Sequence, residues 1–145
     1  MLSRRKVHRR PGIGPAKILC VDDDLHLTDL LRYVLARDGY QPYLAHSGAE
    51  ALLVAESIHL DAVILDANLP DMDGFLLCAR FRTLCEAPVI MLTSRCTEVD
   101  VLTGFKQGAD DYITKPFSMQ ILLQRVAVIL RRQQDAYQPG ISALR

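Results

Sequence analysis

The chain alternates short, continuous apolar runs with longer stretches in which apolar residues recur at helical spacing. Most of the short runs have the length and the β-branched content of buried parallel strands. The run at residues 41–45 is more polar and is expected at the edge of a sheet. The predicted strands are residues 17–21, 41–45, 61–65, 88–92 and 109–113.

The longer stretches predict a helix after each strand. Leucine or valine at positions 27, 30, 31, 34 and 35 forms one helical face, and Gly39 ends this first helix. Ser47, followed three residues later by Glu50, predicts a capping box at the start of the second helix.

Three further helices complete the alternation. The third follows a turn that ends at Gly74, and the fourth ends at Gly108. The fifth has Ser118 near its start, with Arg131 and Arg132 in its last turn, where cations favour the helix dipole. The expected ranges are 75–82, 98–107 and 117–132. Strands alternating with helices in this way predict an α/β fold, a doubly wound five-stranded parallel sheet with right-handed crossovers.

The composition is that of one globular domain. The chain has 145 residues and half of them are hydrophobic, which suffices for a core and excludes a disordered chain. The apolar runs are too short to span a bilayer, and the basic start lacks the apolar segment of a signal peptide. We therefore expect a cytoplasmic protein without membrane contact. Its cysteines form no Cys-x-x-Cys pair and are expected to be reduced, small apolar residues: Cys20, Cys78, Cys85 and Cys96.

The net charge is zero, but acidic and basic residues are unevenly distributed. Residues 1–17 hold six of the 17 basic residues and no acidic one, so residues 18–145 have 11 basic against 17 acidic residues, a net charge of −6. Residues 1–16 read as a flexible basic arm, either a solvated tail or an arm for nucleic acid or a membrane surface. We expect a single domain at 17–132, followed by a linker or disordered tail at 133–145.

Polar side chains follow the apolar runs at the ends of four predicted strands. Asp22 and Asp23 follow the first strand, Asp66 the third, Thr93 the fourth and Lys115 the fifth. Ligands of open α/β sheets bind outside the carboxyl ends of the strands, so these side chains are expected to meet at one edge. Three carboxylates, one hydroxyl and one ammonium suit a divalent metal and a phosphoryl group.

The longer motifs around these residues are Val21-Asp22-Asp23, Leu65-Asp66 with Leu69-Pro70-Asp71-Met72-Asp73-Gly74-Phe75, Met91-Leu92-Thr93-Ser94, and the segment from Gly108 to Phe117. In this order they resemble the motifs of bacterial response-regulator receiver domains, the family of the chemotaxis protein CheY. The resemblance covers about 17–132, and its last segment is most similar to the OmpR/PhoB subfamily of transcriptional regulators. It implies a CheY-like, flavodoxin-like sheet of strand order 2-1-3-4-5.

The resemblance implies that Asp66 is a nucleophile, which takes a phosphoryl group from a sensor histidine kinase and forms an acyl phosphate. Asp22, Asp23, Asp66 and the backbone carbonyl of Asn68 would bind Mg²⁺, with Mn²⁺ as a possible substitute. Since three close carboxylates repel one another, the metal would relieve that repulsion. The chain would catalyse only its own phosphorylation and dephosphorylation.

Other residues would stabilise the phosphoryl group or respond to it. Lys115 would pair with one phosphoryl oxygen, and Thr93 would donate a hydrogen bond to another. By resemblance, Thr93 moves toward the phosphoryl group, Tyr112 turns inward behind it, and the Lys115–Pro116 bond is cis. The side chains of Asn68 and Arg95 lie close enough in sequence to reach the phosphoryl group and to tune its lifetime.

The surface that would respond is formed by the predicted elements 98–107, 109–113 and 117–132. In OmpR/PhoB-type domains this surface forms a twofold dimer through salt bridges. A charge pair usual there is replaced by Val101 and Ile121, so we expect a more apolar dimer surface that permits dimers without phosphate. The residues assigned to it are Val101, Asp110, Asp111, Ile121, Arg125, Val128 and Arg132.

Two other functions are kept beside this one. The chain could be a phosphate-independent interaction or dimerisation module of receiver fold, or a phosphatase of similar fold. The chain contains no helix-turn-helix pattern, so we expect no direct sequence-specific DNA binding by these residues. Either the chain is a fragment, with transcriptional output through a C-terminal DNA-binding effector domain absent from it, or it is a stand-alone receiver that signals by contact.

Overall fold

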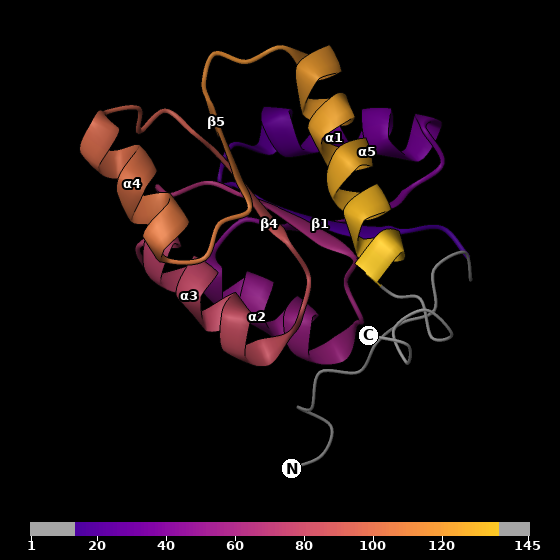
Figure 1. Cartoon of the computed structure of the whole chain (residues 1–145), viewed down its shortest axis with the longest axis horizontal. Coiled ribbons are helices and arrows are strands. Elements are labelled where there is room, and N and C mark those ends of the chain that lie inside the picture. Colours follow the sequence, from indigo (N-terminus) through magenta and orange to yellow (C-terminus); the bar gives the residue numbers. More distant parts are fainter. Residues whose placement is uncertain (1–13, 137–145) are drawn as a thin grey trace.

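A five-stranded parallel sheet of order β2-β1-β3-β4-β5 forms the centre of the computed structural model, which describes residues 14–136 (Figure 1). This order is the one that the resemblance implied. The connection from β2 to β3 passes over β1, whereas each of the other connections leads to a neighbouring parallel strand. The strands are β1 Lys17–Val21, β2 Gln41–Ala45, β3 Ala62–Leu65, β4 Val89–Thr93 and β5 Asp111–Thr114.

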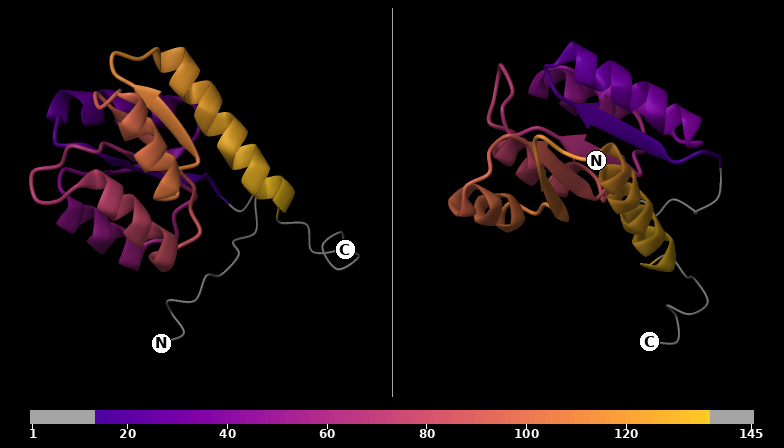
Figure 2. Two further views of the ribbon diagram at one scale, coloured as in Figure 1. Left: turned by 60° about the vertical axis from the view of Figure 1, so that its left-hand side comes forward. Right: turned by 90° about the horizontal axis from the view of Figure 1, so that it is seen from above.

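Helices cover both faces of the sheet (Figure 2). Buried side chains of α1 and α5 pack on one face, and those of α2 and α3 pack on the other. The helices are α1 Leu25–Arg37, α2 Gly48–Ser57, α3 Gly74–Leu84, α4 Glu98–Lys106 and α5 Met119–Ala136. None of the helices in residues 14–136 has the length and apolar character needed to cross a membrane.

The core explains why the central strands are continuous apolar runs. In β1, Ile18 and Cys20 face α1 and α5, whereas Leu19 and Val21 face α2 and α3. A parallel strand covered on both sides must be apolar at every position. Among the largest fully buried side chains is Phe81 of α3, and truncating it to alanine should cost about 3–5 kcal/mol of stability.

The ends of the first two helices largely follow the predictions. Gly39 adopts a φ of +91° after α1, a conformation that suits glycine, and Ser47 accepts a hydrogen bond from the N–H of Glu50 at 3.2 Å. The second half of the predicted capping box is wrong, because the Glu50 carboxylate accepts from the N–H of His46 at 2.7 Å. A complete capping box occurs instead at Thr97, at the start of α4.

The last helix differs most from its prediction of 117–132. It begins at Met119, after the Ser118 hydroxyl accepts a hydrogen bond from the N–H of Ile121 at 3.2 Å. It continues to Ala136, because residues 133–136 contain no glycine or proline to end it. Arg131 and Arg132 are therefore not in its last turn.

The predictions for the two ends of the chain fall mostly outside the described residues. The basic arm was predicted at 1–16 and the tail at 133–145, of which 14–16 and 133–136 are described.

All four cysteines are free thiols. Cys20 and Cys78 are buried as predicted, whereas Cys96 is exposed and contributes nothing to the core.

Candidate functional site

Two buried carboxylates stand side by side at the carboxyl edge of the sheet. β1 and β3 are paired with Val21 opposite Leu65, so the next residues, Asp22 and Asp66, leave the sheet at the same level. The N–H of Asp66 donates to the carbonyl of Val21 at 3.0 Å, which holds this register beyond the last strand residue. Relative exposure is 4% for Asp22 and 5% for Asp66.

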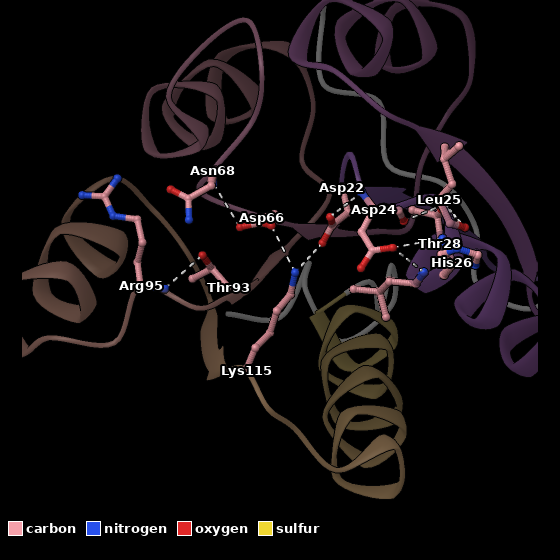
Figure 3. Close-up of polar contacts among 11 residues, drawn as sticks. Asp22, Asp24, Leu25, His26, Thr28, Asp66, Asn68, Thr93, Arg95 and Lys115 are labelled. Atoms are coloured by element: carbon pink, nitrogen blue, oxygen red, sulfur yellow. Dashed lines mark hydrogen bonds and ion pairs between the residues drawn. The ribbon is translucent and has the colours of Figure 1, made fainter.

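Each carboxylate uses one oxygen to accept a local backbone hydrogen bond. The N–H of Asp24 donates to Oδ1 of Asp22 at 2.9 Å, and the N–H of Asn68 donates to Oδ1 of Asp66 at 3.0 Å. These bonds fix the orientation of the carboxylates, so that their other oxygens face each other across the edge of the sheet (Figure 3).

The Lys115 ammonium lies between the two carboxylates. Its Nζ is 2.7 Å from Oδ2 of Asp22 and 3.1 Å from Oδ2 of Asp66. Lys115 follows β5, three strands away from β1 in the sheet, and it reaches across the edge from there. The Lys115–Pro116 bond is cis, as the resemblance implied.

Burial and charge act in opposite directions on these groups. Burial raises the pKa of the Asp22 carboxyl, against the Lys115 ammonium and the Asp24 N–H, which lower it. Burial alone would lower the pKa of Lys115, but its hydrogen bonds and charge interactions with Asp22 and Asp66 outweigh this effect and raise it. Lys115 is therefore a stable cation at neutral pH.

Asp23 completes a set of three acidic residues that could hold a metal ion. One carboxylate oxygen from each of Asp22, Asp23 and Asp66 lies within 4.8 Å of the others. Asp23 is exposed whereas the other two are buried, so the set opens to solvent on one side. Three carboxylates at this separation fit a hard divalent cation that prefers oxygen ligands.

Thr93 ends β4 beside this set and is fully buried. Its Oγ1 accepts a hydrogen bond from the N–H of Arg95 at 3.3 Å. The Tyr112 hydroxyl donates to the carbonyl of Arg95 at 2.6 Å, and the Tyr112 ring lies 6.5 Å from the ring of Phe75. The loop after β4 thus connects Thr93 to Tyr112 through the backbone of one residue.

The Arg95 guanidinium points away from the carboxylates (Figure 3). It bonds Asp100 at 3.0 Å, lies within 4.0 Å of Asp73 and stacks 4.7 Å above the ring of Phe75. The sequence indicated that this side chain could reach a phosphoryl group on Asp66 or the water that attacks it. In the structure, Arg95 instead links the starts of α3 and α4.

Several residues predicted for a dimer surface form contacts within the chain. Asp111 pairs with Arg125 at 2.7 Å, whereas Asp110 accepts from the N–H of Val89 at 2.8 Å and lies 3.4 Å from Arg82. Of the predicted apolar members, Ile121 is 52% exposed. The other members are half-buried or exposed: Val101, Val128 and Arg132.

The sequence reasoning missed three exposed apolar side chains of α4. Val99, Leu102 and Phe105 are 72%, 53% and 46% exposed. Their spacing of three residues places them along one side of the helix, and this periodicity was a signal available in the sequence. It also missed Asp71, whose carboxylate caps α2 and whose partners lie too far away in sequence to be inferred.

Comparisons with known proteins agree with this geometry. A family model described as "Response regulator receiver domain" matches residues 18–127. The transcriptional regulatory protein TrcR of Mycobacterium tuberculosis is 38% identical over 141 residues, which are 97% of this chain and 54% of that protein. The chain thus spans about half the length of that relative.

Solved receiver structures are also similar. A CheY-like response regulator receiver domain protein from Methanospirillum hungatei has a TM-score of 0.81 at 29% identity, over 85% of this chain and 99% of that one. The BeF3-activated N-terminal receiver domain of Klebsiella pneumoniae RstA has a TM-score of 0.76 at 31% identity, over 79% and 98%.

Proposed function

The chain belongs to the family of response regulator receiver domains, and from this premise we propose that Asp66 accepts a phosphoryl group from a sensor histidine kinase. The observation that carries the proposal is the Lys115 ammonium, which bonds both Asp22 and Asp66 at the carboxyl edge of the sheet. An ammonium there stabilises negative charge on either carboxylate and on a phosphoryl group attached to one of them. The chain would be a phosphoacceptor and not an enzyme that turns over a separate substrate.

The transfer requires a nucleophile and positioned charges. A carboxylate oxygen of Asp66 attacks the phosphorus of a phosphohistidine, and the new O–P bond forms as the N–P bond breaks. The electron pair of the broken bond leaves with the imidazole. Lys115 pairs with one phosphoryl oxygen, and the buried hydroxyl of Thr93 donates to another. Because the fold holds these groups before the reaction, catalysis consists of positioning and charge neutralisation.

A divalent cation fits this proposal. Asp22, Asp23 and Asp66, together with the backbone carbonyl of Asn68, would hold Mg²⁺, with Mn²⁺ as a substitute. When bound, the metal supplies positive charge that offsets the repulsion among the carboxylates and the phosphoryl group. The mutual approach of the three carboxylates, within 4.8 Å, supports this assignment.

Phosphorylation would be read out through Thr93 and Tyr112. The Thr93 hydroxyl turns toward the phosphoryl oxygens, and this favours the position that the Tyr112 ring already holds against Gly104 of α4. The surface of α4, β5 and α5 pairs with a second copy, and its apolar side chains permit this pairing without phosphate as well. The exposed Ile121 supports an apolar contribution to that dimer.

We assign the output to transcription, in the cytoplasm. The similarity to the transcriptional regulatory protein TrcR, of which the chain matches 54%, supports this assignment. By resemblance to OmpR/PhoB-type regulators, the partner in this output is a C-terminal DNA-binding effector domain outside these residues.

The proposal is tested by the intact mass of the chain after incubation with Mg²⁺ and acetyl phosphate. Wild type should gain one phosphoryl mass, whereas Asp66→Asn should gain none, because the amide lacks a nucleophilic carboxylate. Wild type without Mg²⁺ should also gain none. A matched control is Asp110→Asn, which changes an acid outside the site and should be phosphorylated normally. An adduct on Asp66→Asn would contradict the assignment of the acceptor.

A second function is favoured by the exposed apolar side chains of α4 and α5. They would suit a phosphate-independent interaction module that uses the same surface constitutively. This alternative predicts a folded wild type that gains no phosphoryl mass and still self-associates. The side chains concerned are Val99, Leu102, Phe105 and Ile121.

A further inference from the structure

The loop between β3 and α3 contains Asn68, whose carbonyl the proposed metal site uses. Its two ends are joined by the backbone: the N–H of Gly74 donates to the carbonyl of Ala67 at 2.8 Å, and Asn68 pairs with Asp73 in an antiparallel bridge. A Cβ on Gly74 would lie 2.2 Å from the carbonyl oxygen of Asp66, so only glycine permits this closure. The ends of the loop are therefore fixed by the junction of β3 and α3.

The tip of the loop is held by a different element, the start of α2. The Asp71 carboxylate accepts hydrogen bonds from the N–H groups of Gly48 and Ala49, at 2.8 and 2.9 Å. Beside it, the Met72 side chain covers Gly48 so closely that a Cβ there would lie 2.4 Å from the Met72 sulfur. Asp71 and Met72 thereby pack the tip of the loop on the first turn of α2.

These bonds complete the cap of α2. Ser47 satisfies the N–H of Glu50, and Asp71 satisfies the two N–H groups before it. The Asp71 carboxylate also lies at the positive end of the helix dipole. Hydrogen bonds from Gly48 and Ala49 lower the pKa of Asp71, so the carboxylate is ionised throughout the neutral range.

The start of α2 is itself tied to the proposed metal site. α2 follows β2, which pairs with β1, and the N–H of Asp22 donates to the carbonyl of Ala45 at 3.1 Å. The contact of Asp71 with α2 therefore joins the loop that carries Asn68 to the segment that positions Asp22.

We infer that Asp71 is a positioning residue for the metal site: it joins the β3–α3 loop to α2 and so holds the Asn68 carbonyl beside Asp22 and Asp66 before the metal binds. This inference rests on the proposed function. Asp71 is exposed and its oxygens face the amides of α2, so it acts through the loop and not as a ligand. Without this contact only the ends of the loop would be held, the tip would be ordered further when the metal binds, and the entropy lost on binding would reduce affinity.

The test measures Mg²⁺ binding by wild type, Asp71→Ala and Ser47→Ala. Binding is measured from the shifts of the backbone amide signals in nuclear magnetic resonance. Both variants remove a cap of α2, but only Asp71→Ala releases the loop. Asp71→Ala should bind Mg²⁺ about tenfold more weakly, in the range found when residues behind metal ligands are removed, and Ser47→Ala should bind normally. Metal-free Asp71→Ala should also show faster hydrogen exchange at residues 67–73.

Asp71 is an anion near the proposed cation site, so its removal could weaken Mg²⁺ binding through its charge alone. Repeating the measurement at high salt separates this charge effect from the effect of loop position. At about 0.5 M KCl a long-range charge effect is largely screened, whereas an effect of loop position persists. Wild-type affinity in Asp71→Ala, equal weakening in both variants, or loss of the effect at high salt would each overturn the inference. If wild type itself bound no Mg²⁺, the proposed function would fail and the inference with it.

Discussion

Lys115 supplies the positive charge that faces the two buried carboxylates of the site. Its ammonium bonds two carboxylates that are almost completely buried, while 23% of its own side chain remains exposed. It offsets their repulsion in the way that a divalent cation would when bound. The Lys115 ammonium thus stabilises the two buried carboxylates. The same ammonium can pair with an oxygen of a phosphoryl group on Asp66.

Replacing Lys115 by methionine should lower the free energy of unfolding by about 1–3 kcal/mol, below the range for a fully buried pair because Lys115 is partly exposed. The loss arises because Asp22 and Asp66 remain buried without the cation that pairs with both of them. Mg²⁺ should restore more stability to the variant than to wild type, since it binds the same carboxylates. Urea unfolding with and without Mg²⁺ measures both effects.

Lys106→Met is a suitable control, because Lys106 is an exposed lysine at the end of α4. It should unfold as wild type does under both conditions. A Lys115→Met variant as stable as wild type without Mg²⁺ would contradict the role assigned to the ammonium.

At the scale of elements, α4 is fitted to the ring of Tyr112 on β5. Gly104 lies within α4 and is buried, and a Cβ there would be 2.7 Å from Cε2 of Tyr112. The ring therefore occupies the space that a side chain at Gly104 would fill. Its hydroxyl reaches the carbonyl of Arg95 from that position. Glycine at position 104 makes the helix less stable than alanine would, but it leaves room for the Tyr112 ring.

A double-mutant cycle tests this fit. In a helix, glycine to alanine normally stabilises by about 1 kcal/mol, and Gly104→Ala should do so when Tyr112 is also alanine. In the wild-type background the same change should be neutral or destabilising, because the new methyl group displaces the ring. The coupling between the two changes is expected to be about 1 kcal/mol or more by urea unfolding. If Gly104→Ala stabilised the protein equally with tyrosine and with alanine at position 112, the Tyr112 ring would not need the space beside Gly104.

At the scale of the whole molecule, the polar site lies at one edge of the sheet and exposed apolar side chains occur on every helix. The carboxylates and Lys115 gather at the carboxyl edge (Figure 3), and four of the exposed apolar side chains lie on α4 and α5: Val99, Leu102, Phe105 and Ile121. Asp110 and Asp111 are engaged by Arg82 and Arg125 of the same chain. Salt bridges to a second copy would have to compete with these pairs, so the apolar side chains carry more of the proposed association.

Ile121→Glu should therefore weaken self-association, both with and without a phosphate mimic, because a desolvated carboxylate opposes an apolar contact. Sedimentation velocity over a range of concentrations measures the shift toward monomer. Leu53→Glu makes the same change at a side chain of α2 that is 65% exposed, and it should leave association unchanged. A wild type that is monomeric under both conditions would rule out this dimer.

Much of this molecule was determined by local sequence. The apolar runs identified the sheet because a strand buried on both faces excludes polar residues, and the first polar residue after a run marks the edge where ligands bind. Asp22, Asp66 and Thr93 were found in this way, and the structure places each at the end of its strand. Element boundaries were less accurate, as the extension of α5 to Ala136 shows, because helix ends depend on caps as well as on periodicity.

The tertiary structure alone decided which distant residues meet. The bonds of Asp71 to Gly48, the ring of Tyr112 over Gly104 and the pair of Asp110 with Arg82 each join segments that share no local pattern. The direction of the Arg95 side chain was decided in the same way, by Asp100 and Phe75. The periodicity of apolar residues indicates which face of an element is buried. It does not indicate which side chain of another element lies opposite that face.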